Sequence, residues 1–231
     1  LITSSAASDV YKRQHKTLVD EFAYPKTGNQ FLYDQLSKYI EESVNEKIKF
    51  NSKVVSILTE ENKITGLSLD NGKIYYCDWL VSTMPITSLI KGLTNVPSKV
   101  KKAASKLRFR NTILVYLLID SDQLFTDQWL YIHEPNVFHG RVTNFRNWSP
   151  DIVGDEESTV ICLEFWCFDE DPIWLKKDND LIKIASKEIS KIGLVDRKLI
   201  KAGKLVKIPK CYPVYERGYK AKLEVVTNYL D

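Results

Sequence analysis

Two hydroxyl side chains and a proline end an apolar run in the first half of the chain. The run is Trp79–Met84, and it contains Ser82 and Thr83 shortly before Pro85. We predict a buried strand here, because a continuous apolar run is typical of a strand that is covered on both faces. In an open α/β sheet, ligands bind beyond the carboxyl ends of the strands. Hydroxyl groups can donate hydrogen bonds to phosphate oxygens, so this point is a candidate ligand site.

Arginine and tyrosine side chains in the second half could hold an anionic ligand. Arg110, Arg141 and Arg146 fall in predicted strands or loops. A guanidinium group can bind a carboxylate or phosphate with two parallel hydrogen bonds, although a surface ion pair is the commoner role for a single arginine. Tyr212 and Tyr215 lie three residues apart and could clamp a ring or donate to a phosphate. The sequence therefore offers candidate substrate-binding residues for an anionic small molecule.

Other classes of site are disfavoured by what the sequence contains. The four cysteines form no Cys-x-x-Cys pair, which disfavours zinc. We expect buried, reduced thiols in a cytoplasmic protein. A formal net charge of +3 demands neither nucleic acid nor an anionic membrane as partner, and no apolar stretch is long enough to span a bilayer. Six aromatic residues are expected mostly in the core or on sheet surfaces, and not in a cofactor site: Trp129, Tyr131, Trp148, Phe165, Trp166 and Phe168.

Periodicity in the first part predicts one helix and a set of short strands. Apolar residues recur at helical spacing over 30–45, after Gly28 and the candidate N-cap Asn29. Residues 70–72 read Asp-Asn-Gly, which is a strong hairpin signal. The predicted strands are 48–50, 54–60, 64–69, 74–77 and 79–84.

The composition of the chain changes after Pro85, and the later part predicts a second, aromatic-rich sheet. Gly193 is a natural C-cap for a helix that opens at Pro172. Predicted helices cover 87–93, 98–107, 172–192 and 219–230. Predicted strands cover 111–119, 129–133, 142–145, 159–168 and 204–208, followed by an extended segment at 210–217.

These elements predict a mixed α/β chain with four parts. Residues 1–14 look like translated vector sequence, so we expect a non-native leader there and truncation at both ends. Residues 15–86 form a helix and a β-meander around one parallel strand, and residues 87–211 form a substrate-binding domain of mainly antiparallel sheet with covering helices. Residues 212–231 return to the first part as an extended segment and a helix.

An ordered series of short motifs resembles the amine-oxidase-type flavoprotein superfamily, which includes monoamine and protoporphyrinogen oxidases and, more remotely, UDP-galactopyranose mutases. The resemblance covers most of residues 22–90. Later segments are similar to bacterial protoporphyrinogen-oxidase-like or mutase-like proteins. The matching residues of the first part are Tyr24-Pro25-Lys26, Gly28, Leu32, Leu36, Ile48-Lys49-Phe50-Asn51, Val54, Ile57, Gly66, Asn71-Gly72, Cys77-Asp78 and Val81–Pro85; the later segments are Asn144–Pro150 and Tyr212–Tyr215.

The resemblance implies FAD as the cofactor and gives individual residues roles. Val54 would hold the adenine through its backbone, and Ser82, Thr83 and Pro85 would line the pocket beside the adenosine or the diphosphate. Gly28 would lie in the loop that passes near the flavin ring. Each position also has an ordinary structural explanation, as a strand residue, a strand end or a turn before a helix.

The sequence departs from the family pattern in one important respect. It contains neither the Gly-x-Gly-x-x-Gly loop that seats the pyrophosphate nor the carboxyl-terminal segment that closes over the flavin. We therefore expect a partial FAD-binding, Rossmann-like domain in a fragment that is inactive alone and has no measurable affinity for FAD. In flavoenzymes the cofactor carries the redox chemistry, so the lack of a catalytic triad is no argument against the class.

Three functions remain open from the sequence. The first is an FAD-dependent oxidoreductase of the amine oxidase or protoporphyrinogen oxidase type. The second is a mutase like UDP-galactopyranose mutase that acts on a sugar nucleotide. The third is a non-catalytic binding module. The substrate, the electron acceptor and the oligomeric state are not determined by the sequence.

Overall fold

The computed structural model describes residues 23–61, 63–154 and 157–231. The predicted leader at 1–14 lies outside the described residues. Helices and antiparallel sheets alternate along the chain, which confirms the mixed α/β class. The elements of the first part are α2 (Gln30–Glu41), β1 (Val54–Glu60), β2 (Lys63–Leu69), β3 (Ile74–Tyr76), α3 (Ile86–Gly92) and α4 (Ser98–Ala104).

A five-stranded sheet dominates the rest of the chain. Its order is β5-β6-β7-β4-β8, and all neighbouring strands are antiparallel. Its strands are β4 (Phe109–Ile119), β5 (Trp129–Tyr131), β6 (Arg141–Asn144), β7 (Thr159–Cys167) and β8 (Ile200–Pro213). The helices of this part are α5 (Phe145–Trp148), α6 (Asp178–Lys191) and α7 (Tyr219–Leu230).

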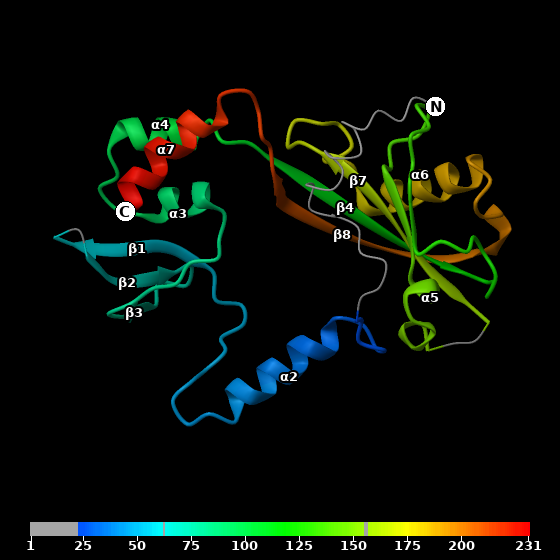
Figure 1. Cartoon of the computed structure of the whole chain (residues 1–231), viewed down its shortest axis with the longest axis horizontal. Helices are drawn as coiled ribbons and strands as arrows, with labels where there is room; N and C mark the ends of the chain where they lie inside the picture. The colour runs from blue at the N-terminus through cyan, green and yellow to red at the C-terminus, as the bar shows by residue number, and fades with distance from the viewer. Residues whose placement is uncertain (1–22, 62, 155–156) are drawn as a thin grey trace, which may run out of the picture.

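The molecule has two lobes, joined by the long strands β4 and β8 (Figure 1). The smaller lobe contains the β1-β2-β3 meander with α3, α4 and α7, and the larger lobe contains the five-stranded sheet with α5 and α6. Helix α4 contacts α7, and α3 contacts β1, so the chain end returns to the first part. The domain limits at 86 and 211 remain predictions.

Alternation of side chains divides the five-stranded sheet into two faces. On one face, buried aliphatic residues of β4 and β7 pack against the apolar stripe of α6, and together they form the main core. The central members of this core are Ile113, Val115, Leu163, Phe165 and Leu181, each at most 1% exposed. The other face carries the remaining side chains of the same strands. It is called the open face below, because α6 does not cover it.

The run Trp79–Met84 is not a strand, so this prediction is wrong. Trp79 is 91% exposed and Val81 is 90% exposed. A parallel strand gains its hydrogen bonds and its cover from neighbouring strands and helices, and within the described residues nothing pairs with this segment. The apolar composition of the run was therefore insufficient to predict its structure.

Other boundaries also differ from the sequence-based expectations. Residues 48–50 form no strand, and α2 ends at Glu41 and not at residue 45. Helix α6 begins at Asp178, six residues after Pro172. Two acidic side chains in its first turn stabilise this start, because they interact favourably with the positive end of the helix dipole. Gly193 follows its C-cap with φ +77°, as expected. In the described part of the chain, no helix is long and apolar enough to cross a membrane.

Candidate functional site

Two adjoining pockets lie on the open face of the five-stranded sheet. We call the first the loop pocket and the second the tyrosine pocket, and the two together the cleft. Their cavities measure about 390 and 520 Å³, and Tyr131 and Arg141 line both. The loop pocket is lined by Tyr24, Asn29, Trp129, Tyr131, Arg141, Thr143, Phe145, Trp148 and Glu164. The tyrosine pocket is lined by Arg110, Tyr131, Arg141, Trp166, Phe168, Tyr212, Pro213, Val214 and Tyr215.

Stacked aromatic rings form one wall of the loop pocket. The Trp129 and Trp148 rings stack with their centroids 5.4 Å apart, and the Tyr24 ring is tilted against Trp148 at 5.1 Å. Such ring pairs contribute beyond their buried area. They fix the loop that contains Tyr24 against the sheet, and the Ser149 hydroxyl adds a 2.7 Å hydrogen bond to the carbonyl oxygen of Lys26.

Gly28 belongs to this same loop. Its φ is +91°, which is the left-handed region that glycine adopts readily, and its amide donates to the carbonyl oxygen of Pro25 at 2.9 Å. The turn directs the chain from the aromatic wall into α2. The loop expected to pass near a flavin ring therefore borders a pocket on the open face.

A partly buried ion pair forms the floor of the loop pocket, and its arginine also lines the tyrosine pocket. Glu164 on β7 lies opposite Arg141 on β6 and is 6% exposed. The Arg141 Nε donates to one carboxylate oxygen at 2.6 Å, and Nη2 donates to the other at 2.8 Å. Burial acts to lower the pKa of Arg141, but the hydrogen bonds and charge of Glu164 outweigh it and raise that pKa. The floor is therefore polar but electrically neutral.

Tyr116 and Cys162 lie beside Glu164 on the open face of β4 and β7. Burial raises the pKa of the Cys162 thiol to about 12, and the nearby negative charge of Glu164 adds to the shift. Burial likewise raises the pKa of Tyr116 to about 12, with a contribution from Cys162. Both groups stay protonated at neutral pH, so Cys162 is not a thiolate nucleophile.

The substrate-binding residues predicted from the sequence meet in the tyrosine pocket, with one exception. Arg110 on β4 pairs in register with Tyr212 on β8, and Tyr215 follows two residues after β8 ends. The guanidinium of Arg110 lies over the Phe168 ring, 5.4 Å from its centroid. Arg146 lies elsewhere, at the start of α5, where its guanidinium donates to the carbonyl oxygen of Ser158.

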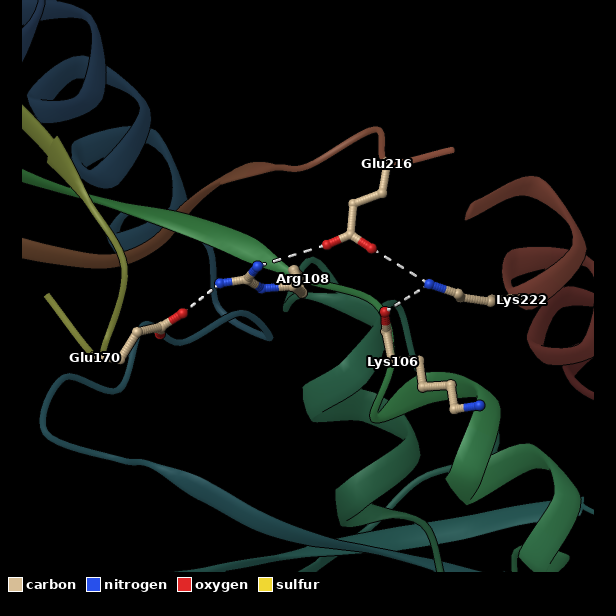
Figure 2. A network of polar contacts seen from close by, with 5 residues as sticks. All are labelled: Lys106, Arg108, Glu170, Glu216 and Lys222. Carbon is tan, nitrogen blue, oxygen red and sulfur yellow. Dashed lines mark hydrogen bonds and ion pairs between the residues drawn. The ribbon is translucent and has the colours of Figure 1, made fainter. Parts of the chain in front are cut away.

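A network of ion pairs engages a neighbouring arginine, Arg108 (Figure 2). Its Nη2 lies 2.5 Å from a Glu170 oxygen, and its Nη1 lies 3.7 Å from a Glu216 oxygen. Glu216 also pairs with Lys222 on α7 at 3.4 Å. Arg108 stacks on Phe168 at 4.2 Å from the ring centroid. The network ties the start of β4 to the smaller lobe, and its two carboxylates compensate the charge of Arg108.

The residues predicted near the adenosine and diphosphate lie in the smaller lobe. Val54 begins β1 opposite Leu69, and Pro85 is the N-cap of α3. Thr83 is exposed, whereas the Ser82 Oγ is buried and has no hydrogen-bond partner among the described residues. A buried hydroxyl without a partner is costly unless a ligand or water satisfies it.

Sequence reasoning missed most of the cleft. Of the six aromatic residues expected mostly in the core or on the sheet surface, Phe165 is a core residue and the other five line the pockets on the open face. Glu164 was not singled out at all. A charged residue in the middle of an apolar strand, with Arg141 in a neighbouring strand, is the signal that could have found the pair.

Comparison with known proteins gives a family match over most of the chain. The model of the family described as flavin containing amine oxidoreductase matches residues 4–192. The match begins within the stretch expected to be non-native, and that expectation stays untested. None of the curated proteins matches the chain.

Several solved structures share the fold. A reduced UDP-galactopyranose mutase is 22% identical with a TM-score of 0.75, and the match covers 90% of this chain and 45% of that one. A candidate protoporphyrinogen oxidase from Exiguobacterium is 18% identical with a TM-score of 0.68, covering 89% and 44%. A fatty acid isomerase from P. acnes that produces CLA is 14% identical with a TM-score of 0.53, covering 85% and 44%. The chain thus spans less than half the length of these three structures.

Proposed function

We propose that this chain, which belongs to the flavin containing amine oxidoreductase family, contributes to an FAD-dependent oxidoreductase that acts on a small molecule. The observation that supports this most strongly is the position of the cleft. Its loop pocket is bordered by the Gly28 loop, and its tyrosine pocket holds the arginine and tyrosine side chains suited to a substrate. We place the protein in the cytoplasm, in keeping with four free thiols.

The residues of this chain fit a bound FAD at two places. The buried, unpartnered hydroxyl of Ser82 is available to a ligand, and Thr83, Val54 and Pro85 stand with it as the residues that would hold the adenosine and diphosphate. The left-handed turn at Gly28 would allow backbone to approach the flavin ring closely. When bound, FAD supplies hydride acceptance from the substrate.

The side chains of the cleft would bind and orient the substrate. Arg110 would hold an anionic group, and Tyr212 and Tyr215 would pack against the part of the substrate next to it. The aromatic wall of the loop pocket would exclude water from the part that faces the Gly28 loop. Arg146 is engaged with Ser158 and lies outside both pockets, so its substrate role is the least supported of the set.

A mutase acting on a sugar nucleotide is the alternative function. The tyrosine pocket favours it in one respect, because a guanidinium and two phenols could contact a diphosphate. The two functions differ in their redox requirement. An oxidoreductase takes electrons from its substrate, whereas the mutase chemistry needs a reduced flavin and leaves the substrate unoxidised overall.

The experiment is to purify the protein translated from the complete reading frame that contains this sequence. The oxidoreductase proposal expects a yellow protein whose flavin absorbance bleaches anaerobically with substrate alone. A flavin that bleaches only with dithionite, followed by interconversion of sugar-nucleotide isomers, would favour the mutase. A colourless protein that binds no added FAD would overturn both and leave the non-catalytic binding module.

The 231-residue chain is the matched control for that experiment. We expect it to bind FAD too weakly to measure, since it has no Gly-x-Gly-x-x-Gly loop for the diphosphate. Equilibrium dialysis against FAD measures this directly. Tight binding by this chain alone would show that the residues around Ser82 and Gly28 suffice.

A further inference from the structure

We propose that the cleft selects a monoanionic ligand with a flat or extended apolar body, such as an aromatic or unsaturated monocarboxylate, and that Arg110 is the residue that binds its anionic group. The proposal deepens the proposed function, on which it rests, by naming the substrate class of the same cleft. It follows from the charges that line the two pockets, the partners that each charge has already, and the nature of the walls.

Arg141 does not provide a free positive charge. Its Nε and Nη2 both donate to Glu164, and the carboxylate accepts them with its two oxygens at 2.6 and 2.8 Å. Glu164 is 6% exposed and the Arg141 side chain is 29% exposed, so solvent screens this pair only in part. Both members of the pair line the loop pocket, and Arg141 also lines the tyrosine pocket, where its charge is already compensated by Glu164. Such a compensated pair suits a carbonyl or hydroxyl group of a ligand better than a second anion.

The other basic groups nearby are either engaged or placed elsewhere. Arg108 is held by Glu170 and Glu216 (Figure 2). The Lys210 ammonium points to the hydroxyl groups of Thr87 and Ser88 at 3.3 and 3.2 Å, and Lys210 lines a different pocket, between the sheet and α3. Neither charge is directed into the cleft.

Arg110 is the remaining basic residue of the cleft. Within the described residues it forms no ion pair, and its guanidinium rests over the Phe168 ring at 5.4 Å from the centroid. A cation–π contact of this kind leaves the N–H donors of a guanidinium available, and they can bind a carboxylate with two hydrogen bonds. The cleft, as far as the described residues form it, therefore carries one uncompensated positive charge.

The walls around that charge are largely aromatic. Tyr131, Trp166, Phe168, Tyr212 and Tyr215 surround it in the tyrosine pocket, and the loop pocket continues the aromatic surface. Aromatic faces bind flat, apolar groups. A diphosphate carries more negative charge than one guanidinium compensates, and the surplus would be desolvated against these rings. The charge balance thus favours a monocarboxylate over a sugar nucleotide.

The test compares ligands of the same shape that differ in charge. The protein from the complete reading frame is titrated by isothermal calorimetry with 1-naphthoate, with its neutral analogue 1-naphthamide, and with UDP. Because hydrogen bonds between charged groups are the strong ones, we expect 1-naphthoate to bind at least about tenfold more tightly than 1-naphthamide. We also expect it to bind more tightly than UDP. The preference for the carboxylate should shrink as the salt concentration rises.

Two variants locate the charge. Arg110→Gln should bring the ratio of the naphthoate and naphthamide affinities close to one while naphthamide binding persists, which shows that the cleft is still folded. Lys210→Gln removes a nearby positive charge outside the cleft and should leave the ratio unchanged. Equal binding of the two naphthalenes by the wild type, tighter binding of UDP than of naphthoate, or an unchanged ratio in Arg110→Gln would overturn the proposal. A colourless protein that still passes these tests would refute only the proposed flavoenzyme function.

Discussion

Replacement of Glu164 by glutamine should both destabilise the protein and change the charge that the cleft accepts. A glutamine side chain at this position could accept one hydrogen bond from Arg141, but its amide group would face the second donor. Breaking a buried ion pair from one side costs about 3–5 kcal/mol. The Arg141 side chain is 29% exposed, so water can solvate part of the released charge. We therefore expect the free energy of unfolding to fall by about 2–3 kcal/mol.

Urea-induced unfolding at neutral pH, followed by circular dichroism, measures that loss. The control is the double variant Arg141→Met and Glu164→Met, which removes both charges and fills the floor with apolar side chains. Replacing a whole buried pair is often nearly neutral, so the double variant should be more stable than Glu164→Gln. A double variant that loses as much stability as Glu164→Gln, or more, would refute the coupling between the two side chains.

The same substitution should alter ligand preference. Glu164→Gln leaves Arg141 uncompensated, so the cleft gains a second positive charge beside Arg110. A second charge near a bound anion is worth about 1–2 kcal/mol at a partly screened site, which is about 5- to 30-fold in affinity. Naphthalene-1,4-dicarboxylate should therefore gain affinity relative to 1-naphthoate. If calorimetry shows no change in their ratio, the neutral floor is not what limits the wild-type cleft to one anionic charge.

Three further predictions concern the surroundings of the cleft. Burial raises the pKa of Cys162 to about 12, so the folded state keeps a proton that the unfolded chain loses above the ordinary thiol pKa of 9.0. The free energy of unfolding should therefore fall as the pH rises above about 9. In urea titrations, Cys162→Ser should remove about 1.3 kcal/mol of the fall that the wild type shows between about pH 8 and pH 10. Gly140→Ala would place a Cβ 2.3 Å from the Trp166 ring, so it should lower the free energy of unfolding by about 1–3 kcal/mol and shift the tryptophan emission. Gly92→Ala is the control, because its Cβ meets nothing closer than 3.7 Å, and it should not be destabilising in the same urea titration. Glu216→Gln removes partly exposed ion pairs and should lower the free energy of unfolding by less than about 1 kcal/mol, with only a slight shift of the thermal midpoint. A larger loss would mean that the network in Figure 2 holds the two lobes together.

The parts of the fold that the sequence predicted well are those whose side-chain pattern is determined within one element. Strands β4 and β7 alternate between core and open face, and α7 has the predicted bounds of residues 219–230. The segment Trp79–Met84 failed because its structure depends on neighbours. An apolar run has the same local pattern whether or not strands lie beside it, so only the tertiary structure could decide.

The cleft was predicted in part, for a similar reason. Arg110 and Tyr212 were chosen for their chemistry, and the β4–β8 register then places them opposite each other. That register is set by hydrophobic burial on the α6 face and was not read from the sequence. Arg146 has the same chemistry, but its guanidinium is used within the fold, by the carbonyl oxygen of Ser158. Residue type alone could not separate these two arginines.

The register also explains why the cleft, as the described residues form it, has one uncompensated positive charge. A strand buried on its α6 face must send every second residue to the open face, so Glu164 and Trp166 both point there once Phe165 enters the core. The pairing of β6 with β7 then fixes Arg141 opposite Glu164 and neutralises it. Arg110, on the other side of β7, has Tyr212 as its partner across the β4–β8 pair and keeps its charge. A shift of β6 by one residue would point Arg141 to the core face and leave Glu164 without its guanidinium. The selectivity that we propose for the cleft therefore depends on strand pairing as much as on the residues that line it.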